Sequence, residues 1–308
     1  MSTSKPVITV LGSYAVGMTM CTERFPTCGE TLLGKNFQQM HGGKGSNQAI
    51  EAARLGAQTN FCGCVGKDVF GDSAIALFQQ EGIHYDHVKR SALYPTGVGF
   101  INVDKNGNNI ITIDFGANND LSDADIEPLE DLIAKSDILL IQLEIALAAV
   151  ECAARLAKKN GVKVILNPAP FQPISDELIK NVDIMTPNET EAKLLLNLNP
   201  ELPVTERELA EAIYRKGASQ VVVTLGERGA YIFSQEIKKV IPAREVTAID
   251  STGAGDTFSA ALAVAIAEGN DLENAVKFAN TAAGLSVTKY GVVTSLPYRQ
   301  EVERYLAG

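Results

Sequence analysis

Short apolar runs alternate with helical patterns along most of this 308-residue chain, and this alternation constrains its fold more than any other feature. Each such pair is typical of one strand of a parallel sheet followed by a crossover helix. We therefore predict an α/β fold with three layers, in which a mostly parallel central sheet is flanked by helices. The predicted strands cover residues 7–11, 60–65, 138–143, 162–166, 183–186 and 220–224. The predicted helices cover residues 46–55, 73–80, 146–159, 190–196, 205–216, 255–268 and 272–287.

Two stretches, residues 14–41 and 97–115, break this alternation, because they carry β-rich patterns and turn signals without a helix. Within the second stretch, residues 98–103 and 110–115 flank a turn that ends at Gly107, which predicts a hairpin. Strands that leave a parallel sheet and return to it favour a small separate sheet, which we interpret as a lid. No repeat or long linker divides the chain, so residues 1–308 are predicted to form one domain with this lid.

The charge balance excludes some partners. There are 27 basic and 37 acidic side chains, a net charge of −10, and no basic cluster that could hold a nucleic acid. No apolar run reaches the roughly 18 residues of a membrane span, and the first residues lack the pattern of a signal peptide. An anionic substrate would therefore need local backbone donors to hold it.

The cysteines and histidines indicate neither a disulfide framework nor a zinc site. Five cysteines occur without a pair of CxxC units, which favours reduced thiols in a cytoplasmic protein. His84 and His87 lie three residues apart, but a zinc site needs at least three protein ligands, so we assign no metal to this pair.

The most informative motif is the heptad DSTGAGD at residues 250–256, which leads directly into an apolar helix. Its small residues let consecutive N–H groups converge at the N-terminus of that helix, where an anion such as a phosphate is favoured. Asp256 lies in the first helical turn, where its carboxylate can accept the proton of an attacking hydroxyl. The alternative for a lone GxGD is an ordinary glycine turn, but the whole heptad is far more specific.

A second motif, GGKGSNQ at residues 42–48, precedes a helix and combines close backbone approach with the polar side chain of Asn47. Its alternative interpretation is a simple turn at the start of a helix. The chain contains neither a GxxxxGK[ST] loop nor a GxGxxG fingerprint, which argues against a nicotinamide dehydrogenase. A nucleotide would have to be held in some other way.

Two further motifs follow predicted strands, where open α/β sheets place their ligands. In TPNETE at residues 186–191, Asn188 and Glu191 would share a helical face and suit a hydrated magnesium ion or phosphate groups, although the segment could also simply cap a helix. In TLGERG at residues 224–229, the glycines would let a nucleotide lie against the backbone. Its alternative is an ordinary glycine-containing turn.

These four motifs, in this order, closely resemble those of the ribokinase family of carbohydrate kinases, which transfer the γ-phosphate of ATP to a sugar hydroxyl. The resemblance extends from about residue 7 to residue 297 and includes QLE at 142–144 and NPAP at 167–170. It implies that Asp256 is the catalytic base and that the backbone of Gly253, Ala254 and Gly255 forms an anion hole.

The resemblance also implies the ligands of each substrate and ion. The nucleotide would contact Asn188, Glu191, Thr224, Gly226, Gly229, Gly255 and Asn280, with Mg²⁺ near Asn188 and Glu191. The sugar would contact Gly43, Lys44, Gly45, Asn47, Glu144 and Asp256. An activating K⁺ would be held, mostly by backbone carbonyls, at Asp250, Thr252, Ser286, Lys289, Gly291 and Ser295. The open edges of the lid strands would favour a homodimer.

The chain departs from the family pattern at the end of the first strand. The family has Gly-Ser-x-Asn-x-Asp there, and its Asn and Asp bind sugar hydroxyls, but Ala15 and Gly17 occupy these two positions here. A charge-assisted hydrogen bond contributes about 1.5–3 kcal/mol, so the loss should weaken ribose binding at least tenfold.

Three neighbours of these positions, Tyr14, His41 and Asp114, could line an altered pocket. They could equally be a packing residue of the lid, a strand residue and a solvated charge. We predict an ATP-dependent, ribokinase-like enzyme for ribose or a related pentose. The alternatives are a kinase for a nucleoside or another non-ribose acceptor, and a nucleotide-binding protein without catalysis.

Overall fold

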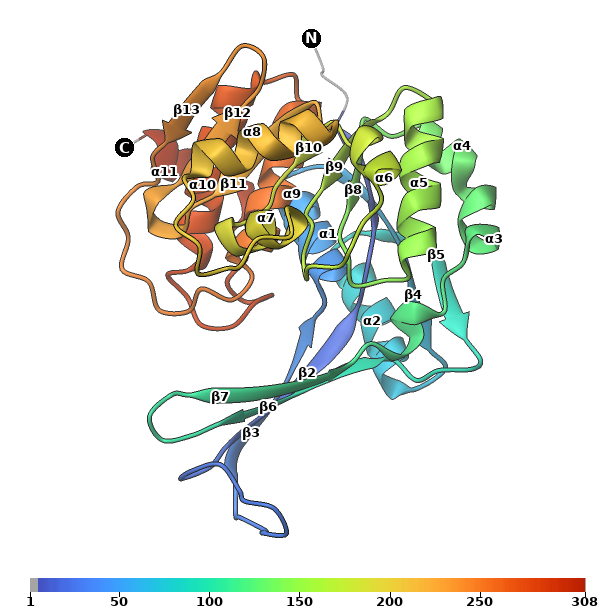
Figure 1. Cartoon of the computed structure of the whole chain (residues 1–308). Coiled ribbons are helices and arrows are strands. Elements are labelled where there is room, and N and C mark those ends of the chain that lie inside the picture. Colours follow the sequence, from blue (N-terminus) through green and yellow to red (C-terminus); the bar gives the residue numbers. More distant parts are fainter. Residues whose placement is uncertain (1–4, 308) are drawn as a thin grey trace.

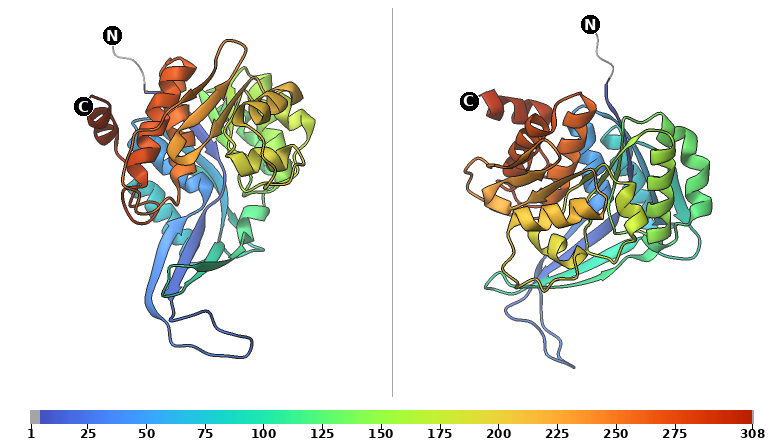
Figure 2. Two further views of the ribbon diagram at one scale, coloured as in Figure 1. Left: turned by 60° about the vertical axis from the view of Figure 1, so that its left-hand side comes forward. Right: turned by 45° about the horizontal axis from the view of Figure 1, so that its top comes forward.

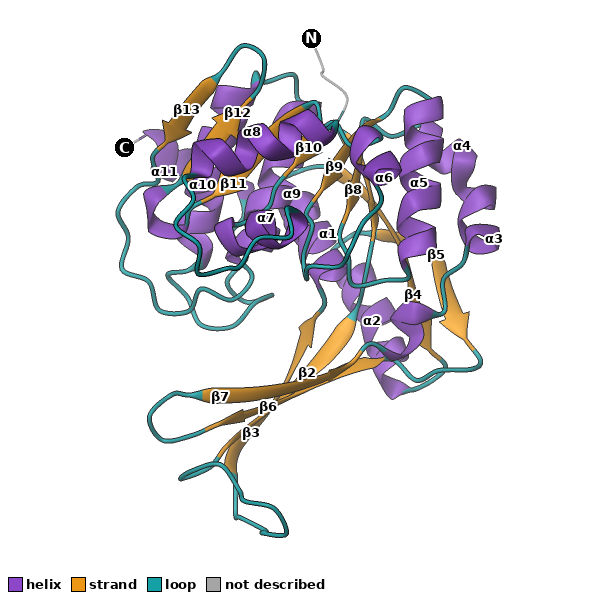
Figure 3. Cartoon of the chain, viewed as in Figure 1, coloured by secondary structure: helices purple, strands orange, loops and turns teal. Residues whose placement is uncertain are grey.

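The computed structural model describes residues 5–307, and its largest element is a nine-stranded sheet (Figures 1 and 3). Across the sheet lie β13 (Lys238–Ile241), β12 (Ala230–Phe233), β11 (Gln220–Thr224), β10 (Ile184–Met185), β9 (Lys163–Leu166), β8 (Ile138–Ile141), β1 (Val7–Leu11), β4 (Gln58–Gly66) and β5 (His84–Ser91). Neighbours are parallel from β5 to β11, and β12 and β13 are antiparallel. The predicted, mostly parallel sheet is confirmed.

Helices cover both faces of this sheet. One face carries α1 (Lys44–Arg54), α2 (Val69–Gln80), α9 (Ala254–Ala267), α10 (Leu272–Ser286) and α11 (Arg299–Ala307). The other carries α3 (Asp123–Ile126), α4 (Glu130–Ala134), α5 (Leu147–Lys159), α6 (Asp176–Lys180), α7 (Glu189–Leu195) and α8 (Glu206–Lys216). Buried side chains alternate between the two faces along each central strand; in β8, Ile138 and Leu140 face one layer and Leu139 and Ile141 the other. The three-layer prediction is therefore confirmed.

A separate four-stranded sheet has the order β3 (Lys35–Gly42), β2 (Ala15–Cys21), β6 (Gly97–Val103) and β7 (Asn109–Asp114). All of it comes from the two stretches that break the βα alternation. It projects from one end of the large sheet in every view (Figures 1 and 2). The predicted small sheet is confirmed as part of the fold, and several of its large apolar side chains are exposed: Phe37, Phe100, Ile110, Ile111 and Ile113.

The order of strands creates a switch point beside β1. From β1 the chain first builds outward through β4 to β5, and later returns to the opposite side of β1 to add β8, β9 and β10. The segments that follow β1 and β8 therefore diverge at the carboxyl ends of these strands. Open α/β sheets bind ligands in the crevice that such a divergence creates.

The sequence did not predict β5, which contains His84 and His87, because its side chains are mostly polar or partly exposed at the edge of the sheet. Within residues 5–307, no cluster of three or more His, Cys, Asp or Glu side chains is arranged to hold a metal ion. All five cysteines are free thiols; Cys62, Cys64 and Cys152 are buried, whereas Cys28 is exposed. No helix among the described residues combines the length and apolar character needed to cross a membrane.

Candidate active site

The loop before α1 lies against the segment that follows β8, at the switch point. One oxygen of Glu144, Oε2, accepts hydrogen bonds from Ser13 Oγ at 2.5 Å and from the backbone N–H of Lys44 at 2.8 Å. A Cβ on Gly45 would lie 2.4 Å from the backbone nitrogen of Ser13, so only glycine lets α1 begin this close to β1. The predicted sugar ligands of the GGKGSNQ motif and Glu144 are thus neighbours.

Asp256 lies in the first turn of α9 and is only 5% exposed. Its carboxylate accepts two hydrogen bonds from α1, one from Asn47 Nδ2 to Oδ2 at 2.9 Å and one from Gln48 Nε2 to Oδ1 at 3.1 Å. The predicted base is therefore held by the motif that the sequence assigned to the sugar.

Gly253 is the N-cap of α9, and its backbone has the left-handed conformation with φ of 81°. A Cβ at this position would also lie 2.8 Å from Val292 Cγ1, so both its conformation and its surroundings require glycine. The first N–H groups of a helix have no partner within the helix, and they carry its positive dipole end. The N–H of Ala254 donates to the carbonyl of Ser251 at 3.3 Å, and Gly253 and Gly255 flank it beside Asp256, an arrangement suited to an anion.

Lys44 lies among three carboxyl groups that the sequence placed in different motifs. The negative charge of Asp256, with those of Glu144 and Glu191, raises the pKa of Lys44, although burial acts in the opposite direction. Burial raises the pKa of Glu144 and of Glu191, and the charge of Lys44 partly counteracts it in both. The site therefore combines one ammonium group with three acidic groups.

The predicted nucleotide ligands Asn188 and Thr224 are adjacent, since they form a parallel β-bridge. Asn188 Oδ1 accepts the N–H of Glu191 at 2.8 Å, and Glu191 Oε2 accepts the N–H of Asn188 at 2.8 Å. This capping box was the alternative interpretation of the motif. It uses the single amide oxygen of Asn188 and one of the two carboxylate oxygens of Glu191. The second oxygen of Glu191 and the amide NH₂ of Asn188 are not part of the capping box, so capping and ligand binding are compatible here.

The other predicted nucleotide ligands meet at one backbone segment. Gly229 has φ of 95°, and a Cβ on it would lie 2.2 Å from the carbonyl oxygen of Ile241. That same carbonyl accepts a hydrogen bond from Asn280 Nδ2 at 2.9 Å. Gly226 begins the short 3₁₀ helix η3 (Gly226–Arg228) that leads to Gly229.

The predicted cation ligands come from two loops that are tied together. Asp250 Oδ1 accepts the N–H and the hydroxyl of Thr252 at 3.0 and 2.6 Å, and its Oδ2 accepts the N–H of Gly291 at 3.1 Å. Partial burial opposes ionisation of Asp250, but these hydrogen bonds outweigh it and lower the pKa.

The remaining cation candidates lie in the second of these loops. Val287, next to Ser286, accepts the backbone N–H groups of residues 249 and 250 through its carbonyl, at 2.7 and 3.2 Å. The side chain of Lys289 donates to Glu301 Oε1 at 2.9 Å, and its backbone N–H donates to the carbonyl of Ser286 at 3.4 Å. Ser295 donates to the carbonyl of Val292 at 2.7 Å, and Val292 itself lies against Gly253.

The three side chains suspected of lining an altered pocket have different environments. Tyr14 is fully buried, and its hydroxyl lies 2.7 Å from His41 Nδ1. Asp114 is exposed and accepts the N–H of Gly116. In β2, Ala15 pairs with Gly97 and Gly17 with Gly99, so these four positions carry no side-chain hydrogen-bonding group.

A model of the pfkB family carbohydrate kinases matches residues 6–299. The chain belongs to this family. The carbohydrate kinase is 43% identical to a protein named ribokinase from Haemophilus influenzae, over 98% of this chain and 99% of that one. It is 35% identical to a protein named deoxyribokinase from Salmonella typhi, over 97% and 98% of the two chains. A solved structure of Arabidopsis thaliana ribokinase complexed with ribose and ATP superposes with a TM-score of 0.89, at 36% identity, covering 99% of this chain and all of that one.

Sequence reasoning assigned no role to two residues of the kinase that the structure places in the site. Gln48 donates to Asp256, and Ser13 donates to Glu144. For Gln48, the available signal was a long polar side chain within a predicted helix. In the structure, all residues from 45 to 52 of that helix are buried. For Ser13, the signal was a hydroxyl immediately after β1 at a switch point.

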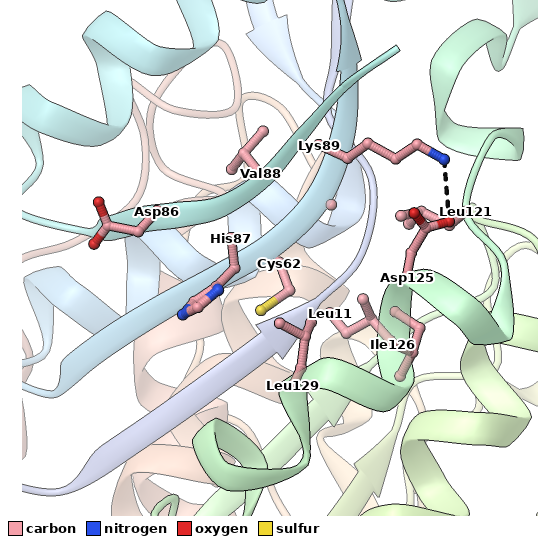
Figure 4. Close-up of a pocket in the computed structure, with 11 residues that line it drawn as sticks. Leu11, Cys62, Asp86, His87, Val88, Lys89, Leu121, Asp125, Ile126 and Leu129 are labelled. Carbon is pink, nitrogen blue, oxygen red and sulfur yellow. Dashed lines mark hydrogen bonds and ion pairs between the residues drawn. The ribbon is translucent and has the colours of Figure 1, made fainter.

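A cavity of about 210 Å³ lies elsewhere in the kinase, between β5 and the segment that contains α3 (Figure 4). Its polar lining includes His87 and Asp86, and an ion pair between Lys89 and Asp125 at 3.0 Å crosses its rim. It shares no residue with the predicted active site, so the site described above does not depend on it.

Proposed function

We propose that this kinase transfers the γ-phosphate of ATP to a hydroxyl of ribose or of a closely related pentose. The observation that carries the proposal is the carboxylate of Asp256, which lies at the N-terminus of α9 and is held by Asn47 and Gln48. The similarity to the Arabidopsis thaliana protein, whose structure contains ribose and ATP, supports this choice of substrates.

In this mechanism Asp256 removes the proton of the acceptor hydroxyl while the hydroxyl oxygen attacks the γ-phosphorus. The bond from that phosphorus to the oxygen bridging to the β-phosphate breaks, and ADP leaves with the electron pair. The N–H groups of Gly253, Ala254 and Gly255 stabilise the negative charge on the transferred group. The nucleotide would lie along Asn188, Thr224, Gly226, Gly229 and Asn280.

Magnesium fits the residues at the start of α7. Glu191 is partly buried, and the capping box leaves its second carboxylate oxygen for other contacts. Mg²⁺ prefers oxygen ligands and usually keeps several waters beside nucleotide phosphates, where it neutralises their charge. We assign Asn188 and Glu191 to this role, through waters or directly.

Potassium fits the paired loops at Asp250 and Gly291. Three hydrogen bonds fix the Asp250 carboxylate and tie the two loops together, which places one negative charge where a cation would be favoured. We assign Asp250, Thr252, Ser286, Lys289, Gly291 and Ser295 to this ion. Because Val292 contacts Gly253, an ordered loop here would support the anion hole.

The acceptor is tested by a panel of ribose, 2-deoxyribose, hexoses and nucleosides with coupled detection of ADP, with and without K⁺. The small residues Ala15 and Gly17 favour 2-deoxyribose as a second acceptor, since no side chain there rewards an extra hydroxyl. The Salmonella typhi deoxyribokinase is a relative consistent with this. Efficient turnover of ribose alone would refute the shift in specificity, and ATP binding without ADP release for any acceptor would refute the proposed activity.

A matched variant, Gly17→Asp, sharpens this test. A Cβ at Gly17 would lie 3.4 Å from Ile101 Cδ1, so the substitution needs little rearrangement. A carboxylate that accepts from sugar hydroxyls should lower the KM for ribose by about tenfold. The KM for 2-deoxyribose should fall less, and an equal fall for both sugars would contradict a role in hydroxyl recognition.

We further propose a homodimer through the small sheet and a cytoplasmic location. The exposed Phe100 and Ile110, which face the same side of the adjacent strands β6 and β7, would be covered by a second copy. Light scattering would give the oligomeric state, and an Ile110→Glu variant should shift a dimer toward monomer. The free thiols are consistent with a reducing compartment.

A further inference from the structure

Four buried amide side chains form a hydrogen-bonded network around Asp256. Besides Asn47, they are Gln48 in α1, Gln142 just after β8 and Asn167 just after β9. Each is at most 5% exposed, so water does not compete for their hydrogen bonds. The network therefore spans the carboxyl ends of the central strands and ends at the proposed catalytic carboxylate.

Gln48 is the centre of this network. Its Nε2 donates both to Asp256 Oδ1 at 3.1 Å and to Asn167 Oδ1 at 3.2 Å. Its Oε1 accepts from Gln142 Nε2 at 2.5 Å. Gln48 therefore uses its two donors and one acceptor on three different partners, which leaves it little rotational freedom.

The direction of the network is set by a backbone carbonyl. Asn167 Nδ2 donates to the carbonyl oxygen of Thr186 at 3.1 Å, and a carbonyl oxygen can only accept. The amide oxygen of Asn167 must then face Gln48, which in turn must present its NH₂ group to Asn167 and to Asp256. Flipping the amide of Gln48 would place its oxygen against two acceptors, Asn167 Oδ1 and Asp256 Oδ1. The carbonyl of Thr186 and the carboxylate of Asp256 therefore determine the orientation of the Gln48 amide.

We propose that Gln48 is a positioning residue, oriented by Asn167 and Gln142, which holds the carboxylate of Asp256 as a proton acceptor in a fixed rotation. This inference rests on the proposed role of Asp256 as the base. A donor aimed at each carboxylate oxygen fixes the rotation of the group, and each oxygen keeps a lone pair for the acceptor hydroxyl. The sugar itself need not touch Gln48.

The test compares wild type with Gln48→Met, which keeps the length of the side chain but removes both polar groups. We expect kcat for ribose to fall about tenfold to a hundredfold, the effect of one hydrogen bond to a charged group, while KM stays near its original value. The fall in kcat without a rise in the KM for ribose or for ATP is the signature of a misoriented base. A packing defect that distorts the site would raise KM as well.

Thr59→Val is the matched control, because Thr59 is a buried residue of β4 whose hydroxyl has no hydrogen-bond partner within residues 5–307. It should leave kcat and KM unchanged. Asp256→Asn, measured in parallel, tests the base by itself: if it stays active, the proposed base fails, whereas an inactive Asp256→Asn with an unchanged kcat in Gln48→Met overturns only the positioning role.

Asn167→Leu provides a second variant if Gln48→Met does not fold, as judged by thermal unfolding. It leaves both donors to Asp256 in place but removes the group that orients Gln48. We expect kcat to fall by a smaller factor than in Gln48→Met, with KM unchanged. An unchanged kcat in this variant would also overturn the proposal.

Discussion

The two halves of helix α1 bury polar side chains in opposite ways. In the first half, Asn47 and Gln48 donate to Asp256 and lie within a network of amides. One turn later Glu51 is fully buried, and neither of its oxygens has a hydrogen-bond partner within residues 5–307. Burial alone therefore does not distinguish polar side chains that hold the proposed base from a polar side chain without partners. The hydrogen bonds that each side chain forms make this distinction.

The end of the same helix adds a third arrangement. Arg54 forms a two-pronged ion pair with Glu81, at 2.9 and 2.7 Å, and donates to the carbonyls of Val293 and Leu296 at 2.7 and 3.0 Å. Both side chains of the pair are no more than 10% exposed. Helix α1 thus connects the residues that hold Asp256 to the loop that we assign to K⁺.

The largest expected effect is a loss of kcat, and it concerns Asp256, which the first half of α1 holds. Asp256→Asn removes the proposed proton acceptor but keeps one oxygen that can accept from Asn47 or Gln48. General-base catalysis contributes about 10²–10⁴-fold, so kcat should fall on that scale while the variant stays folded. Steady-state kinetics with ADP detection measures the loss, and circular dichroism confirms the fold.

Glu211→Gln is a suitable control, since Glu211 lies on α8 and, within residues 5–307, forms an ion pair only with the exposed Arg215. Its kcat should equal that of wild type. Turnover of Asp256→Asn close to the wild-type rate would show that the amide network surrounds a residue without a catalytic role.

The second effect concerns stability at the end of α1. Arg54→Met leaves Glu81 buried without its cation and removes the donor shared by two loop carbonyls. Breaking a buried ion pair in this way costs about 3–5 kcal/mol in the free energy of unfolding, which urea denaturation would measure. The half-saturating concentration of K⁺ should also rise, because the loop at residues 293–296 loses its anchor.

Two comparisons control for this interpretation. Arg215→Met removes an exposed i,i+4 partner of Glu211 and should change stability by only about 0.5 kcal/mol. The double variant Arg54→Met with Glu81→Met removes both charges and should recover much of the lost stability. A double variant as unstable as Arg54→Met alone would show that the carbonyl contacts, and not the unpaired carboxylate, dominate.

The sequence predicted those features that depend on local patterns. The β-branched run at residues 220–224 and the heptad at 250–256 define β11 and the start of α9 without knowledge of the rest of the chain. The strand β5 was missed because an edge strand with polar side chains lacks the apolar signal on which the prediction depends.

The contacts between distant residues could not be predicted in the same way. Gln48 and Asp256 are separated by 208 positions, and Arg54 and Val293 by 239. A motif identifies a residue type in a local conformation, but only the packing of α1 against α9 and the loop after α10 determines which polar groups meet. The resemblance to a known family identified the candidate site residues. The amide network around Asp256 became visible only in the folded chain.

The smallest expected effect is a change in stability with pH, and it tests the unpaired carboxyl group of Glu51. Burial raises the pKa of Glu51 well above its ordinary value; the charge of Arg54 opposes this shift and that of Glu301 adds to it. The native state therefore binds a proton that the unfolded chain releases at a lower pH. The corresponding stability is fully present below the unfolded-state pKa and is lost as pH rises through the folded-state pKa.

Glu51→Gln removes this titration, because its amide has no proton to lose. At neutral pH the variant should be more stable than wild type by about 1–3 kcal/mol, and the difference should shrink as pH falls toward the ordinary pKa of a glutamate. Urea unfolding at several values between pH 5 and pH 8 measures this convergence. Parallel stability profiles for the two proteins would mean that Glu51 acquires a partner in solution, and the contrast between the two halves of α1 would then disappear.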